Sequence, residues 1–306
     1  MKVKKITKTK VPNWYFVFSK GGITIKEEIF YSNKIEKDIK IAIIADIHYY
    51  PKYNTKILTN IINQIKTNKP DYLIIAGDIL DKSNYEYQGL LEFLKELTKY
   101  TKIIMTLGNH DIYYRLKRKK SIEEINNNFI NDLASLNKIY LLRDNTFIEN
   151  KICFYGFDLD YEYYYRKKEK LTDFINKVDK LNTKLDSNNY NITIFHSPVN
   201  IYEYINKYPD SNLAKSDFII SGHMHNGCLP YCFTNIINKT FKINHSLISP
   251  NRHLFPDYSQ GRVYKIRDGI IYEGISKLSK SSVLLHKLDF LYHKKVKFIT
   301  IKRVDN

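Results

Sequence analysis

Two side chains that commonly bind metal ions, Asp46 and His48, directly follow a run of apolar residues. Alternate residues of a strand point to the same face. We therefore expect a buried strand over residues 41–49 that directs both side chains at one ion, while Ile47 packs elsewhere. The pair alone is weak evidence, because a turn carboxylate and a packed histidine are common after a strand. The same arrangement, however, returns four more times along the chain.

Seven carboxylate, amide and imidazole side chains follow five predicted strands, and five of the nine histidines fall in these motifs. Parallel strands present their carboxyl ends at one edge of an α/β sheet, so these groups can meet there. Mixed imidazole and carboxylate ligands suit manganese, iron or zinc. The candidate metal ligands are Asp46, His48, Asp78, Asn109, His196, His223 and His225.

Seven ligands are too many for one tetrahedral ion, but they can serve two ions if one carboxylate is shared. Two-metal sites hold their ions about 3.5–4 Å apart, which one bridging carboxylate can span, and Asp78 is the candidate bridge. Gly77, Gly108 and Gly222 each precede a candidate ligand. Glycine there lets the backbone turn sharply and approach the cluster without a Cβ clash.

The elements that must position these groups alternate between strands and helices. Apolar runs predict strands over residues 71–76 and 102–107, and helical periodicity covers residues 55–67 and 90–97. Three successive strand–helix repeats predict a parallel sheet with crossover helices. Further strands are expected over residues 23–30 (an edge strand), 138–142, 151–157, 191–195, 217–220, 262–266 and 269–272, and further helices near residues 122–136 and 171–185.

Taken in order, five motifs resemble the signature of the calcineurin-like metallophosphoesterase superfamily. They are DIH at 46–48, GDILD at 77–81, GNHD at 108–111, His196 after a strand, and GHMH at 222–225. A joint match of five motifs is specific, whereas any one of them would be weak. The resemblance covers residues 40–227. It implies an α/β fold, a four-layer αββα sandwich of two mixed β-sheets flanked by helices, with a dinuclear metal centre at the strand ends.

The resemblance also implies how the ligands divide between two divalent ions, Mn²⁺, Fe²⁺/Fe³⁺ or Zn²⁺. A hydroxide between the ions would attack phosphorus in line, because bound water loses its proton near neutral pH. By motif position, Asp46, His48 and His225 would hold the first ion and Asn109, His196 and His223 the second, with Asp78 bridging.

Three further motif residues have implied or open roles. His110 takes the place of the family's catalytic histidine, which protonates the leaving oxygen. Asp81 matches the carboxylate that orients this imidazole, or else it caps the following helix. Asp111 either supports the ligands from behind or is a cap. GDILDK and GNHD lack the arginine and the glutamate of the superfamily's protein phosphatases, which argues against a phosphoprotein substrate.

The function expected from the resemblance is hydrolysis of a phosphomonoester or phosphodiester. The net charge of +17 keeps open a nuclease, a hydrolase of lipid-linked or nucleotide-sugar pyrophosphates, and a non-catalytic metal-bearing binding module. Basic residues at 115–120 and the Tyr/Lys-rich residues 161–170 either contact nucleic acid or an anionic lipid surface, or form solvated faces. A/T-rich codons also account for an excess of lysine.

Length and composition favour one globular unit, since 43% of the residues are hydrophobic and 26% are charged. We expect an N-terminal basic leader and edge strand (1–39), a metallophosphoesterase domain (40–273) and a basic C-terminal extension packed on it (274–306). No apolar stretch is long enough to cross a membrane or to act as a signal peptide. Cys153, Cys228 and Cys232 are too few for a disulfide framework, so we expect reduced thiols and a cytoplasmic protein.

Overall fold

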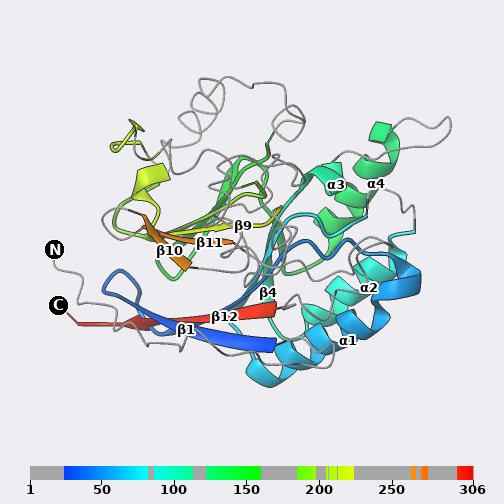
Figure 1. Ribbon diagram of the computed structural model, residues 1–306, viewed down its shortest axis with the longest axis horizontal. Helices are drawn as coiled ribbons and strands as arrows, with labels where there is room; N and C mark the ends of the chain where they lie inside the picture. Colours follow the sequence, from blue (N-terminus) through cyan, green and yellow to red (C-terminus); the bar gives the residue numbers. More distant parts are fainter. Residues whose placement is uncertain are drawn as a thin grey trace, which may run out of the picture.

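The protein folds around two six-stranded β-sheets that pack face to face (Figure 1). The computed structural model describes residues 24–81, 86–112, 122–159, 185–197, 205, 207–211, 213–223, 263–266, 270–274 and 295–305. The first sheet consists, in spatial order, of β1 (Thr24–Ser32), β12 (Lys295–Arg303), β2 (Ile39–Ile44), β3 (Tyr72–Ala76), β4 (Lys102–Thr106) and β5 (Ile139–Leu141). The second consists of β10 (Val263–Ile266), β11 (Ile270–Gly274), β9 (Phe218–Ser221), β8 (Tyr190–Ile194), β7 (Ile152–Gly156) and β6 (Asn145–Glu149).

Strands β2, β3, β4 and β5 are parallel neighbours, as the strand–helix repeats predict. Helices α1 (Pro51–Asn68) and α2 (Gln88–Leu97) make the crossovers and cover the outer face of this sheet (Figure 1). The other helical segments are α3 (Asn109–Ile112), α4 (Ile122–Ser135) and the short 3₁₀ helix η2 (Leu213–Lys215). None of the described helices is both long enough and apolar enough to cross a bilayer.

The apolar residues of β2 show why its sequence is almost continuously hydrophobic. Ala42 and Ile44 pack under the helices, whereas Ile41 and Ile43 point between the two sheets, and all four are fully buried. A parallel strand covered on both faces needs apolar side chains on both. Both sheets also contain antiparallel pairs, β12 with β2 in the first and β6 with β7 and β10 with β11 in the second. The predicted α/β fold with two mixed sheets and flanking helices is confirmed.

The C-terminal strand β12 is the largest difference from the sequence prediction. It lies between the edge strand β1 and β2 and pairs with both, so the predicted C-terminal extension contributes a strand inside the sheet. Val296 and Phe298 pack in the core under the helices, and Ile299 and Ile301 pack between the sheets. Strand β6 and the single-turn helix α3 were also not predicted. The helix expected over 171–185 lies outside the described residues, and the domain boundaries stay predictions.

Candidate metal centre

The two motif residues that follow β2 lie in a turn. Strand β2 ends at Ile44, so the expectation that the strand continues through Asp46 and His48 is wrong. Both residues have left-handed backbone conformations, with φ of 53° and 46°. The turn after β3 fixes them: the Asp46 amide donates to the carbonyl of Gly77 (3.1 Å) and the His48 amide to that of Asp78 (3.0 Å).

Left-handed backbone conformations recur among the candidate ligands. Asp78 and His223 have φ of 52° and 69°, in addition to Asp46 and His48. For a residue with a side chain, such a conformation costs on the order of 1–3 kcal/mol and persists only where its surroundings enforce it. Concentrated strain of this kind is typical of functional sites, and it explains why strand alternation does not describe the convergence of these side chains.

The expected role of the glycines is confirmed at the closest approaches. A Cβ atom on Gly108 would lie 2.2 Å from Asp78 Oδ1 and 2.5 Å from the Asp78 backbone nitrogen. On Gly77, which has φ of 78°, it would lie 2.6 Å from His196 Nδ1. Real Cβ atoms do not approach other atoms so closely, so glycine is required for the ligand loops to lie together.

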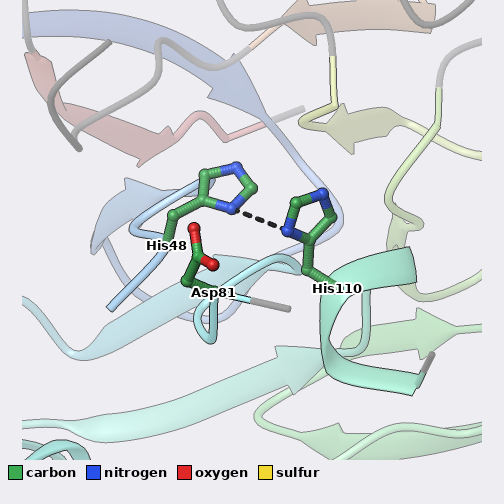
Figure 2. Close-up of side chains that lie close together, drawn as sticks. All are labelled: His48, Asp81 and His110. Atoms are coloured by element: carbon green, nitrogen blue, oxygen red, sulfur yellow. Dashed lines mark hydrogen bonds between the residues drawn. The ribbon is translucent and has the colours of Figure 1, made fainter. Parts of the chain in front are cut away.

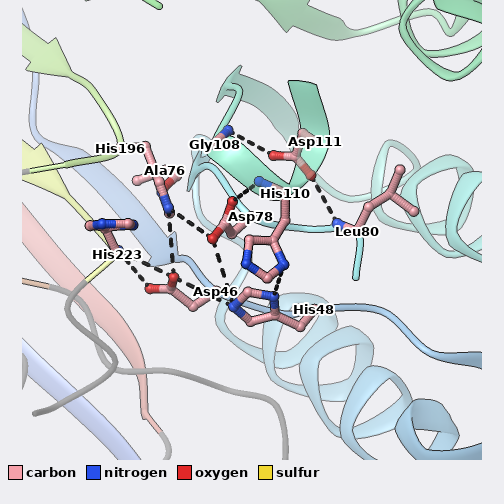
Figure 3. Close-up of polar contacts among 10 residues, drawn as sticks. All are labelled: Asp46, His48, Ala76, Asp78, Leu80, Gly108, His110, Asp111, His196 and His223. Atoms are coloured by element: carbon pink, nitrogen blue, oxygen red, sulfur yellow. Dashed lines mark hydrogen bonds and ion pairs between the residues drawn. The ribbon is translucent and has the colours of Figure 1, made fainter. Parts of the chain in front are cut away.

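The first group of candidate ligands comes from the turns after β2 and β3. Single ligand atoms of Asp46, His48 and Asp78 lie within 4.8 Å of one another, and all three residues are buried (Figure 3). His48 Nε2 is 3.8 Å from both Asp46 Oδ1 and Asp78 Oδ2. An imidazole nitrogen facing two carboxylates at this distance leaves room for a cation between them.

The second group joins the two sheets and shares Asp78 with the first. Ligand atoms of Asp78, His196 (after β8) and His223 (after β9) lie within 4.8 Å of one another. His196 Nε2 is 3.0 Å from Asp78 Oδ2, while its Nδ1 lies 2.8 Å from the carbonyl oxygen of Ala76 and must be the donor to it. This hydrogen bond fixes the tautomer, so that Nε2 faces the cluster (Figure 3). The His223 amide donates to both Asp46 oxygens at 3.1–3.2 Å.

Asn109 provides an independent test of whether the cluster fits a metal ion. It is the first residue of α3 and is only 5% exposed. Among the described residues, none donates a hydrogen bond to its buried Oδ1. A buried amide oxygen normally has a partner, and an oxygen ligand to a cation satisfies that need. The remaining candidate ligand, His225, lies outside the described residues.

Charge coupling links the bridging carboxylate to its neighbours. Burial favours neutral Asp78, but the charges of His196, His110 and His48 outweigh it and hold the pKa of Asp78 well below its ordinary value. Burial likewise opposes charge on His196, yet the carboxylates of Asp78 and Asp46 raise the pKa of His196 to about 9. The pocket thus already pairs a carboxylate with positive charge.

The candidate catalytic histidine contacts a candidate ligand, which the sequence did not predict. His110 Nδ1 lies 3.2 Å from His48 Nδ1, and its amide donates to Asp78 Oδ1 at 2.8 Å (Figures 2 and 3). A carboxylate oxygen of Asp81 lies within 4.8 Å of ring nitrogens of both histidines. Helix α2 begins at Gln88, so Asp81 is not its N-cap. The assignment of His110 and Asp81 as catalytic stays a prediction.

Asp111 joins two of the ligand loops through backbone hydrogen bonds. Its fully buried carboxylate accepts from the amides of Leu80 (2.9 Å) and Gly108 (2.8 Å). The bond to Gly108 closes the first turn of α3 in the manner of a capping box, and the bond to Leu80 fixes the loop after β3. Burial and the nearby charge of Asp78 raise the pKa of Asp111 to about 7. Both open interpretations of Asp111, support and cap, are therefore correct.

Comparison with known proteins identifies the family. Residues 39–227 match the calcineurin-like phosphoesterase family, and the chain belongs to it. Uncharacterized metallophosphoesterases from two strains of Helicobacter pylori are 28% and 26% identical over 207 and 205 residues, covering 66% of this chain. The chain spans about half the length of these relatives (49%). A dimetal phosphatase from Danio rerio aligns with 80% of this chain and 90% of its own at 10% identity, with a TM-score of 0.44.

Proposed function

We propose that this chain is a dinuclear metal-dependent phosphoesterase that hydrolyses a phosphomonoester or a phosphodiester. The observation that carries the proposal is that Asp78 belongs to two compact groups of buried ligand atoms, with Asp46 and His48 on one side and His196 and His223 on the other. One carboxylate between two ligand groups is the arrangement that two adjacent divalent ions require.

The chain supplies nitrogen and oxygen ligands that suit Mn²⁺, Fe²⁺/Fe³⁺ or Zn²⁺. When bound, two such ions would lower the pKa of a shared water, so that hydroxide can attack phosphorus, and would neutralise phosphate charge. In this assignment Asp46, His48 and His225 hold one ion, Asn109, His196 and His223 hold the other, and Asp78 bridges them. His225 is included from its motif position alone.

The contact between His48 and His110 determines where the transferable proton lies. If His48 holds an ion through Nε2, its neutral ring carries the proton on Nδ1. That proton is donated to His110 Nδ1, 3.2 Å away. Neutral His110 then carries its own proton on Nε2, from which the leaving oxygen would receive it. The nearby Asp81 carboxylate favours a positively charged His110 and so holds the general acid ready.

The experiment that tests this function is hydrolysis of bis-p-nitrophenyl phosphate and p-nitrophenyl phosphate by metal-stripped protein reloaded with Mn²⁺. We expect metal-dependent release of nitrophenol, abolished in Asp78→Asn and lowered about 10²- to 10⁴-fold in His110→Ala. Asp71→Asn is the matched control, because this carboxylate accepts only an exposed bond from the Lys40 amide. Undiminished turnover in Asp78→Asn would refute the mechanism, and the preferred substrate would distinguish a monoesterase from a diesterase.

A further inference from the structure

A second charged pair lies at the strand-end edge of the sandwich, where the candidate metal centre is found. Arg143 follows β5 in the first sheet, and Asp158 follows β7 in the second. Arg143 Nε donates to Asp158 Oδ2 at 2.6 Å, so the pair joins the two sheets. The sequence analysis did not select either residue, although both follow predicted strands just as the candidate ligands do.

Strand register places Arg143 beside the loop that carries Asn109. In the parallel pair β4–β5, Met105 lies opposite Leu141, and the Leu142 amide donates to the Met105 carbonyl at 2.7 Å. Continuing that register by two residues brings Arg143 level with the residue two positions before Asn109. Neighbouring strands lie about 4.8 Å apart, so only one strand spacing separates this arginine from a ligand-bearing strand.

The same argument places Asp158 next to a ligand in the second sheet. In the parallel pair β7–β8, Gly156 lies opposite Ile194, so two residues further Asp158 is level with His196. A Cβ on Gly156 would lie 2.7 Å from Thr106 Cγ2, which shows how closely β7 approaches β4 here. The Arg143–Asp158 pair is therefore next to the centre in both sheets.

The position of Arg143 is fixed by the folded chain. Its amide donates to Asn145 Oδ1 at 2.9 Å. The intervening residue Asp144, in a left-handed conformation with φ of 56°, accepts the Asp158 amide at 3.0 Å. Since Asp158 is only 8% exposed, its carboxylate holds the guanidinium from the buried side. A prepositioned guanidinium loses little entropy when it binds a ligand.

The guanidinium keeps donors for a ligand. The Arg143 side chain is 44% exposed, and within the described part of the chain no acceptor bonds its Nη1 or Nη2. The guanidinium fork matches the geometry of phosphate oxygens and binds them bidentately. An arginine serving only to join the sheets would not need to leave this end exposed beside the site.

We propose that Arg143 binds a second phosphate group of the substrate while the first lies at the metal centre. The inference rests on the proposed phosphoesterase function and names its substrate class, compounds with two adjacent phosphate groups such as pyrophosphate-linked nucleotides. Asp158 is the residue that positions the guanidinium. The single strand spacing between the arginine and the loop of Asn109 fits two neighbouring phosphates better than two distant ones.

The test measures binding, so it does not depend on turnover. Calorimetric titrations of Mn²⁺-loaded protein, in a His110→Ala background that slows hydrolysis, compare UDP-glucose, with two phosphates, with UMP, with one. We expect Arg143→Ala to weaken UDP-glucose binding about 10- to 100-fold, the loss typical of a hydrogen bond to a charged group, and UMP binding less than about threefold. Arg143→Lys, which keeps the charge and loses the fork, should lie between the parent and Arg143→Ala.

Lys151→Ala is the matched control, because it removes one positive charge from a 59% exposed side chain at the opposite end of β7. It should change neither affinity. Metal content and circular dichroism of each variant exclude loss of the fold. Equal weakening of both probes in Arg143→Ala, no weakening of either, or a parent protein that does not prefer UDP-glucose to UMP would each overturn the proposal. Hydrolysis of bis-p-nitrophenyl phosphate by the parent chain reports separately on the phosphoesterase function.

Discussion

At single residues of the candidate metal centre, the backbone determines where the ligand atoms lie. Gly108 illustrates this, because a Cβ there would collide with both the carboxylate and the backbone nitrogen of Asp78. We expect Gly108→Ala to displace the bridging carboxylate and to lower the bound metal, measured by elemental analysis after gel filtration, to well below that of the parent protein. The same substitution should lower the free energy of unfolding by about 1–3 kcal/mol or more, since overpacking a buried site forces strain.

Gly89→Ala is the control for Gly108→Ala. A Cβ on Gly89 would meet the hydroxyl of Tyr49 at 2.3 Å, and the end of a side chain can move where a backbone atom cannot. Alanine is also the better helix former by about 1 kcal/mol. Gly89→Ala should therefore keep the metal content and most of the stability. Full metal binding by Gly108→Ala would show that the loops can separate without losing the site.

Asp111 gives a prediction about stability. Asp111→Ala leaves the amides of Leu80 and Gly108 buried without their acceptor, at about 1–3 kcal/mol for each unsatisfied group. Urea unfolding of the metal-free protein should show a loss in that range. Asp186→Ala, which removes an exposed bond from the Asn188 amide, should change the free energy of unfolding by less than about 1 kcal/mol. Similar losses in the two variants would contradict the role given to Asp111.

The identities of the candidate ligands followed from the sequence, but the way they converge did not. Asp46 and His48 are two residues apart, which suggests one face of a strand, whereas they lie in a strained turn held by the loop after β3. The contact of His110 with His48 was equally out of reach, because it depends on two loops from different strands. Motif spacing reports which groups meet, and only the folded backbone reports how.

At the level of whole elements, β12 shows where pattern reading failed. Four lysine and arginine residues dominate its sequence, KVKFITIKR, and made it resemble a solvated extension. The informative signal was the apolar run from Val296 to Ile301, which faces both cores. Strands β2, β3 and β4 were predictable because strands buried on both faces are almost wholly apolar and helices separate them.

The integration of β12 can be measured. Phe298 is fully buried against the helix-covered face of the first sheet, and truncating a buried phenylalanine costs about 3–5 kcal/mol. We expect Phe298→Ala to lower the free energy of unfolding by that amount in a single transition. Val304→Ala is the control, because Val304 is 40% exposed and lies just beyond the strand, so a change within about 0.5 kcal/mol is expected. A Phe298→Ala protein as stable as the parent would mean that residues 295–303 are dispensable.

Across the whole molecule, the candidate centre lies between the sheets. Loops after β2, β3 and β4 of the first sheet supply Asp46, His48, Asp78 and Asn109, and the loops after β8 and β9 of the second supply His196 and His223. A cation bound there would hold the two sheets together at this edge. Binding to the folded state alone stabilises it by mass action, so Mn²⁺ should raise the melting temperature of metal-stripped protein.

The size of that stabilisation should depend on pH through His196, which is surrounded by the Asp78 and Asp46 carboxylates, the Ala76 carbonyl and the His223 ring. These carboxylates raise the pKa of His196 to about 9, so the metal-free protein carries a proton there at neutral pH. That proton stabilises the metal-free fold below the ordinary histidine pKa of about 6.5, and the contribution is lost as the pH rises through about 9. A metal ligand must be neutral, so ion binding has to displace the proton.

Between pH 8.0 and pH 6.5 the apparent affinity for Mn²⁺ should therefore fall about 30-fold for this one proton, which removes about 2 kcal/mol of the stabilisation at saturating metal. Thermal melts with and without Mn²⁺ at the two pH values measure the effect. Calorimetry in buffers of different ionisation enthalpy counts the protons released. His196→Gln should release fewer protons than the parent, because an amide has none to lose in this range. An equal Mn²⁺-induced shift at both pH values, with no proton release, would mean that His196 is already neutral in the metal-free protein and that its carboxylate neighbours do not hold it charged.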